Sequence, residues 1–168
     1  MTEIIVALNY NDYYTNLNLI GELENLINIY KIGIQTPYKD DLTIELRNLN
    51  KKIFWDFKYY DIDSTIKAAV LQAEDQGIDF LTVHSHCIES AMAVRKQVKI
   101  LEVYSLSNAY TTFAPSFKTD GLISYRDDAK DFKKYYPNLI YVTPGVRLSN
   151  HSIDDHVRPT TIAQAKYS

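Results

Sequence analysis

Three charged residues, Asp56, Lys58 and Asp61, form the pattern Asp-x-Lys-x-x-Asp directly after an apolar run. The apolar run is typical of a buried strand. Because alternate residues of a strand point to the same side, Asp56 and Lys58 are expected to share one face, and Asp61 lies beyond the strand's end. A charged group on a buried strand costs several kcal/mol unless it is paired. The pattern therefore indicates a compensated ionic network or an active site, and we interpret it as both.

Proton transfer is the chemistry that this array could support. Opposite charges a few Å away favour the ionised form of a group, so the flanking carboxylates would keep a buried Lys58 ammonium charged. A fixed ammonium stabilises negative charge that develops beside it and can then donate a proton. His, Cys and carboxylate residues nowhere show a convincing metal-ligand spacing. We therefore expect no metal site and no cofactor.

Short apolar runs alternate with amphipathic segments along the chain. The runs predict strands over residues 4–8, 30–34, 52–58, 80–84, 100–105, 122–125 and 139–143. The amphipathic segments predict helices over residues 13–27, 40–49, 65–76, 88–97 and 127–135, and the start of a last helix over 160–166. Asp63 and Ser64 are expected to cap the helix over 65–76. This alternation of strand and helix predicts βα units and a parallel sheet.

Two architectures compete for such a chain, an open doubly wound sheet and a closed (β/α) barrel. A Gly-rich phosphate loop follows none of the predicted strands. Polar residues gather instead just after the strand ends, namely Asn9, Asp12, Lys31, Asp56, Lys58, His84, Ser107, Pro144 and Gly145. Polar side chains that converge from several strand ends are typical of a TIM-type (β/α) barrel, which we favour.

The strand count bears on how complete such a barrel is. Seven strands are predicted, and a complete barrel has eight. We therefore expect residues 1–168 to form a single (β/α)-barrel domain that is incomplete or truncated, with its C-terminal βα unit missing.

Length and composition exclude several classes of protein. The 168 residues carry a net charge of only −3, which gives no electrostatic footprint for nucleic acid or an anionic membrane. The apolar runs are too short to span a bilayer, and the first residues have no basic region typical of a secretory signal. The single cysteine, Cys87, excludes an internal disulfide and fits a reducing compartment. We expect a cytoplasmic protein with no nucleic-acid or membrane partner.

Six motifs, taken together, resemble those of the orotidine 5′-phosphate decarboxylase family. They occur in the family's order and span nearly the whole chain. They are Ile4-x-Val6-Ala7-Leu8, Tyr30-Lys31-Ile32-Gly33, Asp56-x-Lys58-x-x-Asp61-Ile62 with Thr65, Thr82-Val83-His84, Asp120-Gly121-Leu122-Ile123-Ser124, and Thr143-Pro144-Gly145-Val146-Arg147. The Asp-x-Lys-x-x-Asp-Ile element is the most specific of them.

The resemblance implies decarboxylation of orotidine 5′-monophosphate to uridine 5′-monophosphate, without a cofactor, in pyrimidine biosynthesis. Lys31, Asp56, Lys58 and Asp61 would then form an alternating charged network. Lys58 would protonate the pyrimidine carbon that loses carbon dioxide, Asp56 would press against the substrate carboxylate, and Lys31 would contact the ribose.

The resemblance also implies which residues bind the substrate and how the subunits cooperate. Asp61, Ile62 and Thr65 would reach into the neighbouring subunit's site, which makes the enzyme a homodimer with shared active sites. The loop after Gly145 would close over the substrate. The implied substrate-binding residues are Asn9, Ile62, Thr65, Ser107, Pro144, Arg147, His156 and Arg158.

The chain differs from the family's pattern at several positions. Asn9 stands where the family usually has Asp, and His156 stands where it typically has Gln on the phosphate. The sequence ends at Ser168, before the Gly-Arg of the eighth strand that normally grips the 5′-phosphate. Arg147, Arg158 and His156 would have to bind that group, and we expect a weak catalyst or an inactive one.

Two other functions stay open at this point. The first is a metal-dependent sugar-phosphate decarboxylase or lyase of the same fold group, which shares the Asp-x-Lys-x-x-Asp element. Such relatives resemble one another in having an acidic residue where this chain has Lys31, and Ala-Gly where it has Ile62. Both differences favour decarboxylation of orotidine 5′-monophosphate over this alternative. The second is a non-catalytic remnant of a barrel that keeps the motif.

Overall fold

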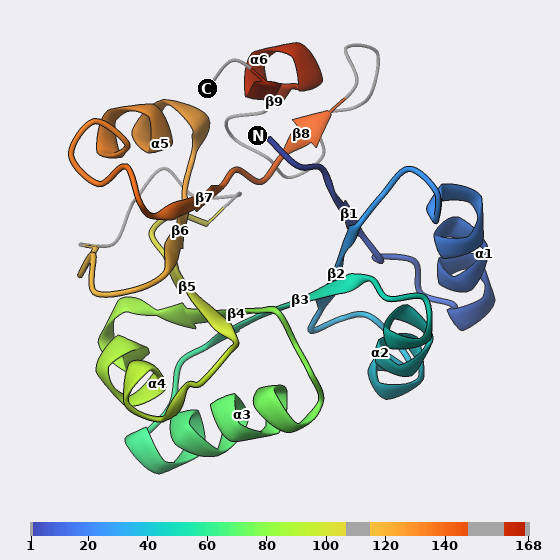
Figure 1. Cartoon of the computed structure of the whole chain (residues 1–168), viewed down its shortest axis with the longest axis horizontal. Coiled ribbons are helices and arrows are strands. Elements are labelled where there is room, and N and C mark those ends of the chain that lie inside the picture. The colour runs from blue at the N-terminus through green and yellow to red at the C-terminus, as the bar shows by residue number, and fades with distance from the viewer. Residues whose placement is uncertain (1, 107–114, 148–159, 167–168) are drawn as a thin grey trace.

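A parallel sheet of seven strands organises the protein, for which the computed structural model describes residues 2–106, 115–147 and 160–166. Strands adjacent in the sheet are consecutive in the chain, in the order β1 to β7. The strands are β1 (Ile5–Ala7), β2 (Ile29–Gly33), β3 (Lys52–Tyr59), β4 (Phe80–His84), β5 (Lys99–Val103), β6 (Gly121–Ile123) and β7 (Ile140–Val142). The sheet curls into an arc, with β1 and β7 as its two edges in the described residues (Figure 1).

Helices cover the outer side of this arc (Figure 1). They are α1 (Tyr13–Leu23), α2 (Lys39–Asn48), α3 (Asp63–Asp75), α4 (Ile88–Val94) and α5 (Arg126–Phe132), with a short 3₁₀ helix η1 (Ser85–Cys87) before α4. Except between β5 and β6, where the described residues contain no helix, strand and helix therefore alternate as the βα units of a parallel sheet require. The predicted (β/α) barrel type of fold, with its seven counted strands, is confirmed.

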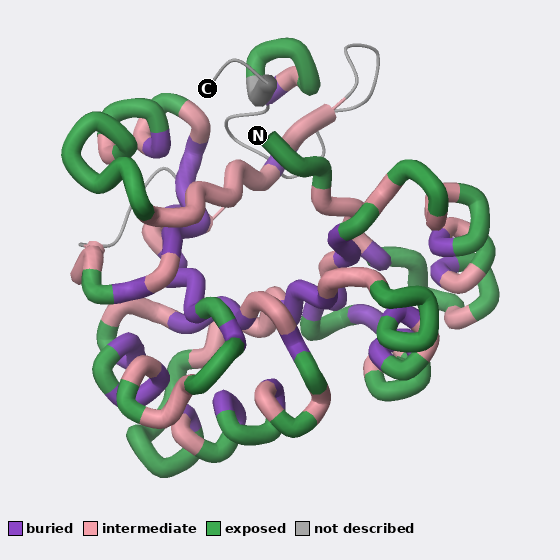
Figure 2. The backbone as a smooth tube through the Cα atoms, in the orientation of Figure 1, coloured by how far each residue is buried: buried purple, intermediate pink, exposed green. Residues whose placement is uncertain are grey.

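The two faces of the sheet bury different sets of side chains. The outer face packs against the helices through residues such as Tyr30, Trp55 and Leu81. The inner face forms a second apolar layer from alternate strand positions, namely Ile5, Ile29, Phe54, Phe80, Leu101, Ile123, Ile140 and Val142. Figure 2 shows the strands mostly buried or intermediate, and the helices exposed on their outer sides. A layered interior of bulky side chains is what a TIM-type barrel requires.

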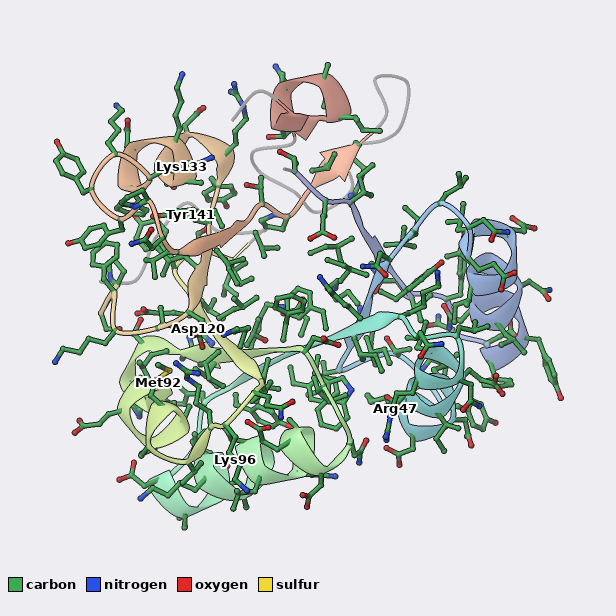
Figure 3. All side chains as sticks on the ribbon, in the orientation of Figure 1. Arg47, Met92, Lys96, Asp120, Lys133 and Tyr141 are labelled. Atoms are coloured by element: carbon green, nitrogen blue, oxygen red, sulfur yellow. The ribbon has the colours of Figure 1, made fainter. Side chains whose placement is uncertain are left out.

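Aspartates at the amino ends of the strands fasten neighbouring strands together. Asp79, just before β4, accepts a hydrogen bond from the Ile53 backbone N–H at 2.8 Å, and Asp120, just before β6, accepts one from Ile100 at 2.9 Å. The Asp120 carboxylate, labelled in Figure 3, also forms an ion pair with Arg95 at 3.2 Å. Charges at this end of the sheet thus hold the fold together.

Several element boundaries differ from the predicted ones for identifiable reasons. The helix predicted over 88–97 ends at Val94, because Glu74 accepts hydrogen bonds from the backbone N–H groups of residues 96, 97 and 98 and holds them in a bend outside the helix. The helix predicted over 65–76 begins at Asp63, so Asp63 and Ser64 lie within its first turn. Ile62 is its N-cap residue and provides no side-chain cap.

A second, two-stranded parallel sheet was not predicted. It pairs β8 (Val146–Arg147) with β9 (Thr160–Thr161), and α6 (Ile162–Lys166) follows. Thr161 and Gln164 form a reciprocal capping box: each backbone N–H donates to the other residue's side-chain oxygen, at 2.9 and 3.2 Å. In the view of Figure 1 these elements lie between β7 and β1.

Candidate active site

The predicted charged residues meet on the inner face of the sheet, toward the carboxyl ends of β2 and β3. Lys31 Nζ lies 3.1 Å from Asp56 Oδ2, and Lys58 Nζ lies 2.7 Å from Asp56 Oδ1. One carboxylate therefore bridges two ammonium groups. Register explains the meeting of Lys31 and Asp56: Asp56 pairs with Gly33, two residues beyond Lys31 on the same face of β2.

Burial and charge act in opposite directions on Asp56, whose side chain is only 12% exposed. Burial alone would raise the pKa of its carboxyl group, but the charges and hydrogen bonds of Lys31 and Lys58 outweigh burial and lower that pKa below its usual value. Asp56 is thus held as a carboxylate. The two lysine side chains keep more solvent contact, 22% for Lys31 and 34% for Lys58, so their ammonium groups remain accessible to a ligand.

The backbone at Lys58 is left-handed, with φ of 51°. This conformation costs a non-glycine residue roughly 1–2 kcal/mol. It coincides with an irregularity in the pairing of β3 with β4, because the register shifts between Trp55 and Tyr59. Strained backbone of this kind concentrates at functional sites. Local sequence gives no sign of it, since neither glycine nor asparagine stands at position 58.

Thr82 of β4 joins the cluster, although it was not among the predicted site residues. Its hydroxyl accepts a hydrogen bond from the Lys58 backbone N–H at 2.8 Å and donates one to Asp56 Oδ1 at 3.2 Å. Strand alternation could have found it, because Thr82 shares the inner face with Phe80 on the strand next to β3.

Asp61, Ile62 and Thr65 lie apart from the cluster, on the exposed turn between β3 and α3 and on the first turn of α3. Asp61 Oδ1 accepts a hydrogen bond from the Ile62 backbone N–H at 2.7 Å. In the described ranges of this single chain, Asp61 forms no ion pair within 4.0 Å. The predicted network of four charged residues is therefore represented within one chain by three, Lys31, Asp56 and Lys58.

An open surface depression surrounds this turn. It is lined by Tyr60, Asp61, Ile62, Asp63, Ser64 and His86. The Tyr60 ring packs against two histidine rings, with centroid distances of 5.6 Å to His84 and 4.6 Å to His86. Tyr60 and Ile62 are nevertheless 68% and 70% exposed, a large apolar exposure beside a cluster of charges.

The remaining predicted binding residues are spread along the carboxyl ends of the strands. Asn9 follows β1, and its Oδ1 accepts a hydrogen bond from Gln35 Nε2 at 3.3 Å. Pro144 follows β7 and is half-buried, while Arg147 lies in β8 and donates from Nη1 to the Val146 carbonyl at 3.1 Å. Ser107, His156 and Arg158 lie outside the described residues.

Comparison with known proteins identifies a family that this chain matches along nearly its whole length. The chain matches the model of the "Orotidine 5'-phosphate decarboxylase / HUMPS family" over residues 2–168. It is 30% identical to the orotidine 5′-phosphate decarboxylase of Nitrobacter winogradskyi, across 97% of this chain and 79% of that protein. It is also 30% identical to the enzyme of that name from Afipia carboxidovorans, across 96% of this chain and 80% of that protein.

Solved structures of proteins with this name have the same fold as the chain. Orotidine 5′-phosphate decarboxylase from Lactobacillus acidophilus aligns with a TM-score of 0.70 at 24% identity, covering 86% of this chain and 81% of that one. Orotidine 5′-monophosphate decarboxylase from Methanocaldococcus jannaschii, complexed with the inhibitor BMP, aligns with a TM-score of 0.74 at 19% identity, covering 92% and 83%. At these identities the likeness concerns the barrel fold.

Proposed function

The chain belongs to the orotidine 5′-phosphate decarboxylase / HUMPS family, and on that premise we propose that it decarboxylates orotidine 5′-monophosphate to uridine 5′-monophosphate. The reaction makes it a carboxy-lyase of pyrimidine biosynthesis. The observation that carries the proposal is the bridge of Asp56 between Lys31 and Lys58, at 3.1 and 2.7 Å.

This bridge suits the reaction for a physical reason. Loss of carbon dioxide leaves an electron pair on a ring carbon, and a fixed ammonium beside that carbon stabilises the developing charge. Asp56 orients the Lys58 ammonium through a hydrogen bond at 2.7 Å, so we assign proton donation to Lys58. Asp56 would lie against the departing carboxylate, where repulsion between like charges is relieved as carbon dioxide leaves.

The ribose and the phosphate need further contacts. We assign the ribose to Lys31, which lies in β2, and to Asn9, which follows the neighbouring strand β1; the Leu8 N–H donates to the Lys31 carbonyl at 2.9 Å. Ser107 would face the pyrimidine. Pro144 and Arg147, together with His156 and Arg158, would surround the 5′-phosphate, for which an arginine fork is the best-matched cation.

We further propose a homodimer with shared active sites. Asp61, Ile62 and Thr65 are exposed, and the turn that holds Asp61 also carries the exposed apolar side chains of Tyr60 and Ile62. A second copy would cover this surface and receive Asp61 beside its own Lys58, which completes the alternating charges. An isologous, two-fold interface gives both sites the same composition.

A cytoplasmic location is proposed on narrower grounds. Cys87 is buried, its pKa is raised by burial, and it is the chain's single cysteine, so the protein gains nothing from an oxidising compartment. Among the described residues, the helices are too short or too polar to cross a bilayer.

The metal-dependent sugar-phosphate alternative is not favoured. The family description also names HUMPS, but the similar curated proteins are named orotidine 5′-phosphate decarboxylase. Enzymes of the alternative type are expected to have an acidic residue at the position that Lys31 occupies on β2. Lys31 instead donates a hydrogen bond to Asp56. A basic residue there repels a divalent cation.

An assay in the presence of a chelator tests the proposal. The purified chain should convert orotidine 5′-monophosphate to uridine 5′-monophosphate with EDTA present, because no step requires a metal. The same chain should not act on a 3-keto-gulonate 6-phosphate substrate with added Mg²⁺. Activity only on the sugar phosphate, abolished by EDTA, would replace the proposed function with the alternative.

A further inference from the structure

The pairing of β3 with β4 contains an unusual mismatch around the site. Trp55 pairs with Leu81 and Tyr59 pairs with Val83. Three residues of β3, Asp56, Phe57 and Lys58, therefore stand opposite one residue of β4, Thr82. The extra length of β3 lies in the Asp-x-Lys segment itself. Bulges of this kind re-aim side chains, and they leave a backbone group without its ladder partner.

The Thr82 side chain takes over the missing ladder bond. Its hydroxyl oxygen accepts from the Lys58 N–H at 2.8 Å. Because an N–H can only donate, the hydroxyl must accept there, and its single proton is left for Asp56 Oδ1 at 3.2 Å. Thr82 is itself fully buried, so water does not compete for either bond.

Asp56 Oδ1 is thus shared by two donors from different strands. Lys58 Nζ approaches it at 2.7 Å and Thr82 Oγ1 at 3.2 Å, while Lys31 Nζ takes the other oxygen at 3.1 Å. The Thr82 hydroxyl therefore contacts both the backbone of the lysine and the carboxylate that orients its ammonium. Removing the hydroxyl would release both ends of the Asp56–Lys58 pair at once.

We propose that Thr82 is a positioning residue of the decarboxylation centre, whose hydroxyl locks the left-handed Lys58 backbone and the Asp56 carboxylate into one geometry. The inference rests on the proposed function and adds to it a residue that acts through Lys58 and Asp56. It explains how a strained lysine is held in place by a residue of the neighbouring strand. It also gives a role to a hydroxyl residue that lies opposite the Asp-x-Lys segment, on the same face of the sheet as the inner apolar layer.

Two variants separate the hydroxyl from the shape of the side chain. Thr82→Val keeps the shape and removes both bonds, whereas Thr82→Ser keeps the hydroxyl. We expect kcat to fall roughly 10- to 100-fold in Thr82→Val, as for the loss of a hydrogen bond to a charged group, with KM within about threefold. Thr82→Ser should stay within about threefold of the parent in both constants. Equal activity of Thr82→Val and the parent, or equal impairment of Thr82→Val and Thr82→Ser, overturns the proposal.

A second readout does not depend on turnover. In ¹³C and amide-exchange NMR, Thr82→Val should raise the pKa of the Asp56 carboxyl group and speed hydrogen exchange of the Lys58 amide, and Thr82→Ser should do neither. An inactive parent with these NMR responses would contradict the proposed function but support the role of Thr82. Unchanged NMR signals in an active parent would do the reverse. If Thr82→Val does not fold, Thr82→Ala, which also lacks the hydroxyl but relieves crowding, takes its place.

Discussion

Lys58 combines a strained, left-handed backbone with an ammonium that lies 2.7 Å from a buried carboxylate. A flexible lysine side chain would lose conformational entropy when it became fixed in a transition state. Here the Asp56 carboxylate holds the Lys58 ammonium and the Thr82 hydroxyl holds the Lys58 backbone N–H beforehand. Preorganised charge is the largest source of catalysis in most enzymes, because it needs no rearrangement during the reaction. The central feature of the site is therefore the Lys58 ammonium, whose position is fixed before the reaction.

Replacing Lys58 should separate catalysis from binding. Lys58→Ala should lower kcat by at least about 10²-fold, since the ammonium acts on charge that develops only in the transition state. Binding of uridine 5′-monophosphate should stay within about tenfold of the parent, measured by calorimetry. Lys130→Ala, which removes an exposed lysine on α5, serves as the control and should change neither quantity. A variant of Lys58 that keeps a tenth of the parental kcat would exclude proton donation by this residue.

The pH dependence of stability should report the charge on Asp56. Its pKa in the folded protein is lowered from 3.8, so the carboxylate stabilises the fold above that pH, and this contribution is lost as pH falls through the folded-state value. At pH 6, Asp56→Asn should therefore lower the free energy of unfolding by about 1–3 kcal/mol, reduced from the buried-pair range because both lysines are partly exposed.

Urea titrations of the parent and Asp56→Asn should converge as the pH is lowered below 3.8. A difference that stays constant from pH 6 to pH 3 would show that Asp56 contributes no ionic stabilisation.

Sequence reasoning reached this site through alternation along a strand. The shared face of Lys31 and Asp56 follows directly from the period of two and from parallel pairing. The left-handed turn at Lys58 could not be predicted, since its cause is a hydrogen bond from another strand, 24 residues away in the chain. Strand alternation places Thr82 on the inner face, but its hydrogen bonds to Lys58 and Asp56 are tertiary contacts that alternation does not predict.

The strands β6 and β7 approach each other so closely that Gly121 has no space for a side chain. Gly121 opens β6, and a Cβ atom there would overlap the carbonyl oxygen of Ile140 on the neighbouring strand. The glycine of the Asp-Gly-Leu-Ile-Ser segment is therefore required by the close approach of two backbones. By contrast, a Cβ at Gly21 in α1 would meet no heavy atom within 4 Å beyond its chain neighbours and the nearby backbone of its own helix.

A pair of alanine substitutions tests this contrast. Gly121→Ala should destabilise the protein by about 1–3 kcal/mol or more, because the backbone of β7 must move. Gly21→Ala, its matched control, should stabilise by up to about 1 kcal/mol, since alanine loses less entropy within a helix. Thermal or urea unfolding measures both. If the two variants change the unfolding free energy by the same sign and size, the close approach of β6 and β7 is contradicted.

Helix ends were the least predictable elements. Apolar periodicity correctly placed α4 after β4, but its extension to residue 97 was wrong because Glu74, a residue of α3, binds the N–H groups that would have continued it. Periodicity indicates which face of a helix is buried, but it does not predict a hydrogen bond to a carboxylate of another helix, such as that of Glu74. The β8–β9 pair was missed for a related reason, since two-residue strands have no period to detect.

Across the whole molecule, charge is divided between the two ends of the sheet. Asp79 and Asp120 at the amino ends bind backbone N–H groups of neighbouring strands, whereas Lys31, Asp56 and Lys58 lie toward the carboxyl ends and bind each other. This division is general in barrels of this type, where stability resides at one end and chemistry at the other. In the proposed homodimer, the exposed turn with Asp61 would extend the chemical end toward the second subunit.

Complementation between two inactive variants tests the shared site. In a dimer formed from Asp61→Ala and Lys58→Ala chains, one site contains intact Lys58 and the partner's intact Asp61. A random mixture should regain about a quarter of the parental activity, because half of its dimers are mixed and each has one complete site. Light scattering should show a dimer. A monomer, or a mixture no more active than its components, would rule out shared sites.

The origin of the proton placed on the product tests the central claim most directly. Orotidine 5′-monophosphate should be incubated with the protein in D₂O, and the uridine 5′-monophosphate formed should be examined by ¹H NMR. If the Lys58 ammonium, exchanged with solvent, protonates the ring carbon, the parent will form product with deuterium at C6, and Lys58→Ala will form none above the uncatalysed control. Product formation by Lys58→Ala at the parental rate, or no product from the parent, would contradict the account.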